Sequence, residues 1–238
     1  MSWSKRATPG PDGTLPRSGV RLPYALAVAG LASLANGFAL VVHIVGGMPL
    51  GALLGIVWLV AALAIGAIGV AGGPSVRRGL VRTVAVGLVV GIVATLLYDV
   101  TKSVLAQLDP SPYDPFEATR VFGRILIGAD APATAVTIVG WAFHLMNGTT
   151  FAIAFACLFA RGGHTGRTRG LALGIGWGVF LETFQLILYP GWLSIGFVDE
   201  FSRISFLSHI VFGATLGLLV PAGLRWSERR FTARGSIS

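Results

Sequence analysis

The sequence predicts an all-α integral membrane protein, a polytopic bundle of six transmembrane helices. Of the 238 residues, 54% are hydrophobic and only 12% are charged, whereas about 25% of the residues of a soluble domain are charged. The mean hydropathy is +0.76, and several apolar segments reach the roughly 20 residues that a spanning helix needs. These segments are continuous and do not alternate with polar residues, so they indicate helices and not barrel strands.

Six segments are expected to cross the bilayer. Their approximate limits are 22–46, 50–72, 79–105, 133–160, 170–190 and 203–224. The first is too long for the apolar part of a signal peptide and predicts an uncleaved helix. Residues 22–224 therefore form one membrane domain between two basic tails, residues 1–21 and residues 225–238, both rich in small and basic residues, and the first is predicted to be disordered.

The distribution of charge predicts the orientation. Fourteen of the 18 Lys and Arg residues lie in the two tails and in the second and fourth connections, while seven of the ten Asp and Glu residues lie at or in the odd-numbered connections. By the positive-inside rule, both termini face the cytoplasm, and the expected location is the bacterial plasma membrane. This pattern also accounts for the net charge of +8. The basic residues form no patch interleaved with exposed aromatics, so we expect no nucleic-acid partner.

The third connection, 106–132, contains an expected amphipathic helix. Asp114 is suited to the N-cap, Pro115 to the first helical position, and Glu117 to the third. The apolar and charged side chains then fall on opposite faces; they are Phe116, Val121, Phe122, Ile125 and Leu126 against Glu117, Arg120 and Arg124. Such a helix is expected in the outer interface, either as an anchor or as a lid over a polar site.

Small residues recur at four-residue spacing in most of the apolar segments. They are Gly51 and Gly55, Gly87 and Gly91, Gly170, Gly174 and Gly178, and Gly213 and Gly217. In lipid, where no hydrophobic effect drives helices together, such spacing lets them approach closely. The pattern predicts a compact bundle.

Polar side chains inside the apolar segments mark the candidate site. Glu182 lies within LGIGWGVFLETFQLILYPGW, residues 173–192, and a charge near the bilayer centre costs roughly 2.5–3.5 kcal/mol on insertion scales. It is tolerated when it is protonated, paired or turned toward water. The residues expected to line one outward-facing polar cavity are His144, Asn147, Glu182, Gln185, His209, Ser205 and Asp99.

Structural roles compete with this interpretation. Gln185 and Asn147 are also typical of hydrogen bonds between helices, and Asp99 is spaced for an ion pair with Lys102 one turn later. His43 is expected to be buried and hydrogen-bonded to a serine or to a backbone carbonyl. A short repeat favours a shared site, because His144-x3-Gly148-x-Thr150 recurs as His209-x3-Gly213-x-Thr215.

Four stretches carry a resemblance to a family. They are GLVVGIVATLLYD, WAFHLMNGTTFAIAF, GIGWGVF followed by YPGW, and SHIVFGATLGLL. Over residues 84–220 the chain resembles uncharacterised YagU-like bacterial inner-membrane proteins, which share this four-helix pattern. The series Glu182, Gln185, Pro190-Gly191, Asp199 and Gly213 is similar to VanZ-like membrane proteins. Neither resemblance implies a known reaction.

Three functional classes follow from these residues. The first is a non-enzymatic small transporter or a proton- or solute-responsive membrane component, with Glu182 as the titrating group. The second is a redox or metal-dependent enzyme subunit, with haem or a divalent metal at His144, Glu182 and His209. The third is a structural or assembly subunit. No catalytic residue is predicted and no cofactor is favoured. The single Cys157 excludes an internal disulfide. The expected partners are the lipid bilayer and either a second copy of the chain or other membrane subunits.

Overall fold

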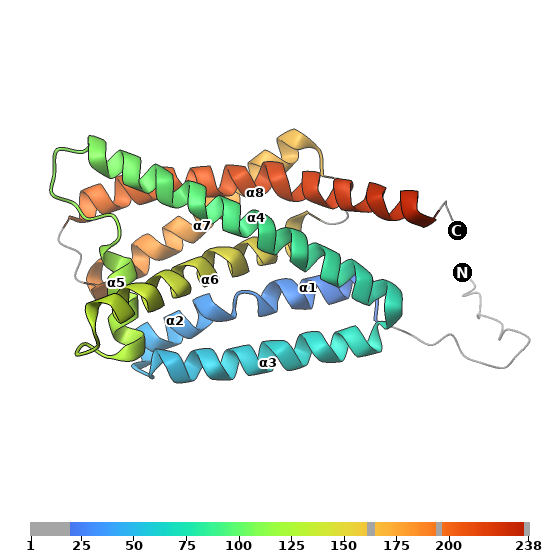
Figure 1. The fold of residues 1–238 in the computed structure, drawn as a ribbon, viewed down its shortest axis with the longest axis horizontal. Coiled ribbons are helices and arrows are strands. Elements are labelled where there is room, and N and C mark those ends of the chain that lie inside the picture. The colour runs from blue at the N-terminus through green and yellow to red at the C-terminus, as the bar shows by residue number, and fades with distance from the viewer. Residues whose placement is uncertain (1–19, 161–164, 194–196, 236–238) are drawn as a thin grey trace, which may run out of the picture.

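The computed structural model describes residues 20–160, 165–193 and 197–235, and its regular structure there is entirely helical (Figure 1). The helices are α1 (Leu22–Ala32), α2 (Ala35–Gly46), α3 (Leu50–Ala71), α4 (Gly73–Leu108), α5 (Glu117–Ile127), α6 (Ala133–Phe159), α7 (Arg167–Leu193) and α8 (Val198–Gly235). In these ranges six stretches are long and apolar enough to cross a membrane, with α1 and α2 counted as one. The chain is a multi-pass membrane protein, and the predicted fold class is confirmed.

The boundaries differ from the expected ones in two places. The first span is broken at Ser33 and Leu34, where the Ser33 hydroxyl donates a hydrogen bond to the carbonyl of Ala29 at 2.8 Å. A serine that bonds back in this way competes with the helical ladder and bends it. The last helix does not end at 224 but continues to Gly235, so it includes most of the residues that were assigned to the C-terminal tail. Residues 1–19 of the N-terminal tail lie outside the described residues.

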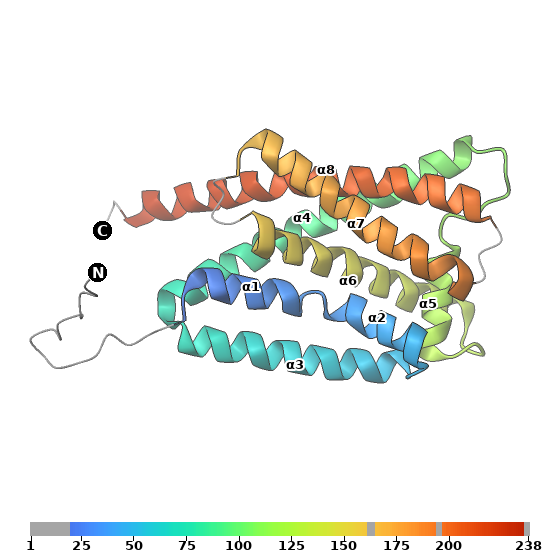
Figure 2. The ribbon, with the colours of Figure 1, turned by 180° about the vertical axis from the view of Figure 1, so that it is seen from behind.

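The spanning helices run roughly along the long axis of the molecule. In both views α4 and α8 lie side by side, while α1 and α2 lie beside α3 on the other side of α6 (Figures 1 and 2). The start of α1 and the end of α8 are at one end of the bundle, and α5 lies across the other end (Figure 1). Large apolar side chains on the outside, such as Val45, Val70 and Ile187, are 75–86% exposed. These side chains contact the lipid bilayer.

The short helix α5 begins at Glu117, two residues later than predicted. The Asp114 carboxylate accepts a hydrogen bond from the Phe116 N–H at 2.9 Å, so it caps a turn before the helix and not the helix itself. Glycines hold α5 against α6. A Cβ built on Gly123 would lie 2.0 Å from the carbonyl oxygen of Val136, and one on Gly140 would lie 2.1 Å from that of Thr119.

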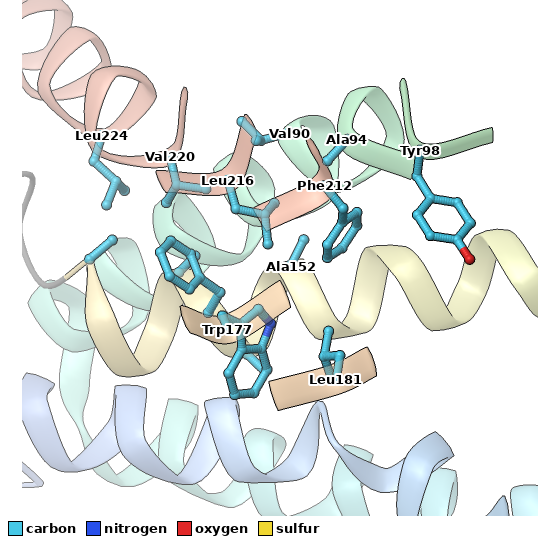
Figure 3. Close-up of a cluster of buried hydrophobic side chains, with 14 residues drawn as sticks. Val90, Ala94, Tyr98, Ala152, Trp177, Leu181, Phe212, Leu216, Val220 and Leu224 are labelled. Atoms are coloured by element: carbon cyan, nitrogen blue, oxygen red, sulfur yellow. The ribbon is translucent and has the colours of Figure 1, made fainter. Parts of the chain in front are cut away.

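The largest core cluster lies between α4, α6, α7 and α8 (Figure 3). Ala94, Leu216 and Val220 have no exposed surface there. Tyr98 lies at one end of this cluster (Figure 3). Beyond Tyr98 the interior becomes polar, and the candidate site begins.

Two lines of small residues hold the helices of this core together, one between α7 and α8 and one between α4 and α6, and each line of contact is called a seam below. In the α7–α8 seam, Cβ atoms built on Gly170 and Gly174 would lie 2.5 Å and 2.1 Å from the carbonyl oxygens of Gly217 and Gly213. Gly178 is the next position of the repeat, and a Cβ built on it would lie 2.1 Å from the carbonyl oxygen of His209. The helices thus touch backbone to backbone, as the four-residue spacing predicts. For Gly51 and Gly55 of α3 the same prediction is wrong, because an added Cβ at either position would meet nothing within 4 Å.

The α4–α6 seam is built in the same way. Added Cβ atoms on Gly87 and Gly91 would lie 2.8 Å from the Cα of Ile153 and 2.8 Å from the Cβ of Ala152. One turn further along, a Cβ on Gly148 would meet the Thr95 hydroxyl. Both seams run toward the end of the bundle that carries α5.

Candidate functional site

Each seam ends in a histidine–carboxylate pair. In the α4–α6 seam, Nε2 of His144 lies 2.8 Å from Oδ1 of Asp99. In the α7–α8 seam, Nδ1 of His209 lies 2.7 Å from Oε2 of Glu182. Asp99 follows Thr95 by one turn, and Glu182 follows Gly178 by one turn, so each acid occupies the next position of a small-residue repeat.

A hydrogen-bond chain surrounds Glu182, which has no exposed surface. The Ser205 hydroxyl donates to Oε2 of Glu182 at 2.9 Å, and the amide nitrogen of Gln185 donates to the same hydroxyl at 2.9 Å. Nδ1 of His209 also lies 3.1 Å from the Ser205 carbonyl. The predicted placement of Ser205 and His209 on one helix face is what allows both to reach Glu182. Oε1 of Glu182 has no hydrogen-bond partner among the described residues.

Tyr98 lies between the two pairs. Its ring centroid is 4.8 Å from that of His209 and 5.9 Å from that of His144. Its hydroxyl is 3.3 Å from the Ser205 hydroxyl. The two histidines therefore both contact one buried aromatic ring, and the pairs belong to one site.

Lys102 is the cation nearest to Tyr98 in the site. Its side chain is only 6% exposed, and Nζ lies 5.6 Å from the ring centroids of both Tyr98 and Phe201, within the range of a cation–π contact. The described residues provide no carboxylate within ion-pair distance of Lys102. The alternative in which Asp99 pairs with Lys102 is wrong, because Asp99 continues the seam toward α6 and bonds His144.

A cavity of about 90 Å³ lies against these groups. At about 30 Å³ per water this is room for roughly three waters, and it is far below the roughly 300–1,000 Å³ of small-molecule sites. Five of the predicted site residues line it, and they are Asp99, His144, Asn147, Gln185 and His209. The expectation that Glu182 and Ser205 also line it needs correction, because both are fully buried behind His209.

Helix α5 closes one side of this cavity. Phe116, Ala118, Thr119 and Phe122 all contribute to its lining. Phe122 is also buried against the rings of Phe143 and Tyr189. The apolar face of α5 thus covers the polar site, which is the lid arrangement considered for this segment.

Charged side chains form two ion pairs at this end of the bundle. Asp114 forms an ion pair with Arg120, and Asp109 forms one with Arg203. Burial raises the pKa of Asp114, but the hydrogen bonds from Phe116 and Arg120 outweigh it and leave the pKa below its ordinary value. The pKa of Asp109 is lowered by its hydrogen bonds from Ser111.

The three proposed metal ligands do not form one ligand set. His144 and His209 are each bonded to a different carboxylate. Across the described part of the chain, no three His, Cys, Asp or Glu side chains are grouped closely enough to hold a metal ion. His43, as expected, bonds a backbone carbonyl, that of Met48 at 2.6 Å, away from the cavity.

Two residues of the site were absent from the predicted set, Tyr98 and Lys102. Their signal was present in the sequence, since Tyr98 precedes Asp99 and Lys102 follows it by nearly one turn. Comparison of the chain with protein-family models, with curated proteins and with solved structures finds no match.

Proposed function

We propose that this protein is a small proton-transporting or proton-responsive component of the bacterial plasma membrane, with its polar cavity on the outer side. The observation that carries the proposal is the presence of two histidine–carboxylate pairs at one water-sized cavity. Ionisable residues inside membrane spans commonly mark ion pathways and proton relays. The resemblance to YagU-like proteins stays a prediction beside this proposal.

The orientation rests on charge. The start of α1 and the end of α8 lie at the end of the bundle opposite α5 (Figure 1). Arg77 and Arg78, near the start of α4, and Arg229 and Arg230, near the end of α8, belong to the basic segments that the positive-inside rule assigns to the cytoplasm. The cavity beneath α5 would then face the outer side.

The chemistry of the pairs suits a proton. Histidine is the side chain that ordinarily changes its charge between pH 5 and 8. The facing atoms of the two pairs, His209 Nδ1 with Glu182 Oε2 at 2.7 Å and His144 Nε2 with Asp99 Oδ1 at 2.8 Å, are within hydrogen-bond distance, which proton transfer requires. Tyr98 contacts both imidazole rings, and Nζ of Lys102 lies 5.6 Å from the centroid of the Tyr98 ring.

The size of the cavity supports the same conclusion. Room for roughly three waters in about 90 Å³ is enough for a hydrogen-bonded water chain, whereas an organic substrate would need α5 to move. A proton moving along such a chain needs no change in the fold.

The test is proton flux in vesicles. Purified protein is reconstituted with a pH-sensitive dye inside, and a potassium diffusion potential is applied with valinomycin. Wild-type protein is expected to acidify the lumen faster than empty vesicles, and Glu182→Gln and Asp99→Asn are expected to abolish the difference. His43→Gln is the control, because it removes a histidine outside the cavity.

A second readout covers a protein that senses protons without conducting them. Infrared difference spectra between pH 5 and pH 8 should contain a carboxyl band that Glu182→Gln or Asp99→Asn removes. The proposal fails if wild-type flux equals that of empty vesicles and no such band exists. If Glu182→Gln then changes thermal stability alone, the assembly-subunit class is favoured.

A further inference from the structure

A second concave feature lies far from the polar cavity, at the end of the bundle that carries the chain termini. It is a groove of about 620 Å³ between α4 and α8. Apolar, mostly small side chains form much of its walls. Val81, Ala85 and Val89 come from α4, and Gly223 and Trp226 come from α8.

The groove opens on the outside of the bundle. Val81 is 61% exposed, Val89 is 62% exposed and Trp226 is 57% exposed. Along α4 the wall from Val81 to Val89 is about 12 Å long at 1.5 Å per residue. Because this surface lies on a membrane-spanning helix, the apolar part of the groove is accessible from lipid.

Three arginines lie at the terminal end of the same groove, Arg77, Arg78 and Arg82. Arg77 and Arg78 are exposed and have no ion-pair partner among the described residues. Arg82 is paired with Glu228 at 3.0 Å, but its Nε is buried without a hydrogen-bond partner.

An aromatic residue marks the depth of the headgroups. The guanidinium of Arg230 lies 3.9 Å from the centroid of the Trp226 ring. Tryptophan is enriched at the level of lipid headgroups, and cytoplasmic basic pockets between spanning helices bind anionic headgroups. The apolar wall and the arginines therefore occupy the depths of an acyl chain and of its phosphate.

We propose that this groove is a binding site for one anionic phospholipid. An acyl chain lies along Val81, Ala85 and Val89, and the phosphate contacts the guanidinium groups of Arg77, Arg78 and Arg82. Guanidinium forms paired hydrogen bonds with phosphate oxygens. A zwitterionic lipid fits the apolar wall equally well, so selectivity depends on the net charge of the headgroup.

The experiment measures lipid binding to the full-length protein in a neutral detergent by native mass spectrometry. Phosphatidylglycerol and phosphatidylcholine with identical acyl chains are compared. We expect phosphatidylglycerol to be retained and to raise the thermal unfolding temperature, and phosphatidylcholine to do neither. Glycerol 3-phosphate and inorganic phosphate should have no effect, because they lack the acyl chain.

Two sets of variants locate the site. Removing two arginines with Arg77→Gln/Arg78→Gln should weaken phosphatidylglycerol binding about 30-fold, from roughly fivefold per charge. The control Arg167→Gln/Arg169→Gln removes two exposed arginines predicted to face the same side of the membrane, outside the groove, and should leave binding unchanged. Ala85→Phe should reduce binding by filling the groove while it keeps every charge.

The outcomes separate the alternatives. Equal retention of the two lipids would overturn the proposal, since the headgroup charge would then have no role. Equal loss of phosphatidylglycerol binding in the two double variants would also overturn it, since the positive charge of that face would then act without a specific site. Stabilisation by inorganic phosphate alone would do the same, because the apolar wall would have no role. Unfolding temperatures without added lipid show whether each variant is folded, and a variant that unfolds early is replaced by Arg78→Gln alone, with an expected loss of about fivefold.

Discussion

The α7–α8 seam can be tested by adding one methyl group. A Cβ at Gly178 would lie 2.1 Å from the carbonyl oxygen of His209, whereas ordinary contacts begin at 3.4 Å. In Gly178→Ala the two helices must therefore separate by about 1.3 Å, the difference between these two distances. Gly176, two residues earlier on the same helix, would meet nothing within 4 Å, so Gly176→Ala is the matched control.

The separation acts on packing and on the site together. Overpacking of this kind costs about 1–3 kcal/mol. If the shift runs along the line between the helices, the 2.7 Å contact between His209 and Glu182 lengthens to about 4 Å, beyond hydrogen-bond length. We therefore expect Gly178→Ala to lower the free energy of unfolding by at least about 2 kcal/mol. Gly176→Ala should change it by less than about 1 kcal/mol, if anything upward, because alanine favours the helix.

The assay is equilibrium unfolding in mixed micelles, followed by the circular dichroism of the helices. A nitrogen NMR spectrum of the histidine side chains reports the site. In Gly178→Ala the His209 ring nitrogen should lose its contact with Glu182 and keep those with Ser205 of its own helix, so its shift should change, whereas in Gly176→Ala the shift should match that of wild type. The reasoning is refuted if the two variants are equally stable, or if the His209 signal is the same in both.

Three further predictions follow from individual contacts. Burial raises the pKa of Asp114 and hydrogen bonding lowers it, and the net effect is a lowered pKa. The Asp114 carboxylate therefore stabilises the folded protein at a pH above its ordinary pKa. This stabilisation is lost as the pH falls through the lowered pKa. Thermal unfolding scans should show a loss of stability below about pH 4 that Asp114→Asn lacks. Lys102→Met should leave the unfolding free energy within about 1 kcal/mol of wild type or raise it, and a loss of several kcal/mol would imply a carboxylate partner. Gly148→Ala should cost about 1–3 kcal/mol, since its Cβ would overlap the Thr95 hydroxyl, and Thr95→Ala in the same chain should restore most of the loss.

The spans were predictable from sequence because the requirement to bury backbone polar groups in lipid acts on every residue of a segment. Long apolar runs give this signal without any tertiary information. The break at Ser33 and Leu34 was not predictable in the same way. Ser33 bonds back to Ala29 there, but Thr95 and Ser208 make the same bond inside continuous helices, so a serine in an apolar run does not by itself mark a break. The continuation of α8 past 224 was missed because hydropathy marks the end of a span and not the end of a helix.

The site was predictable along each helix but not between helices. Ser205 and His209 are four residues apart, so helical geometry alone places them together. That Asp99 bonds His144 and not Lys102 depends on α4 packing against α6, which hydropathy does not encode. The separation of Glu182 from the cavity surface by His209 was hidden for the same reason.

The two seams also give a structural reason for the short sequence repeat. In each seam a histidine lies four residues before a glycine, His144 before Gly148 and His209 before Gly213. The glycines let the backbones approach to contact distance, and at that separation a carboxylate one turn beyond the small residues of the partner helix reaches the imidazole at 2.7–2.8 Å. The burial of each carboxylate thus depends on the close packing of the helices, because only helices this close supply a hydrogen-bonding partner for an acid in lipid. Without the glycine contacts, the carboxylate would lie too far from its histidine to form a hydrogen bond. Without the histidine, the carboxylate at the end of the seam would be buried without a partner.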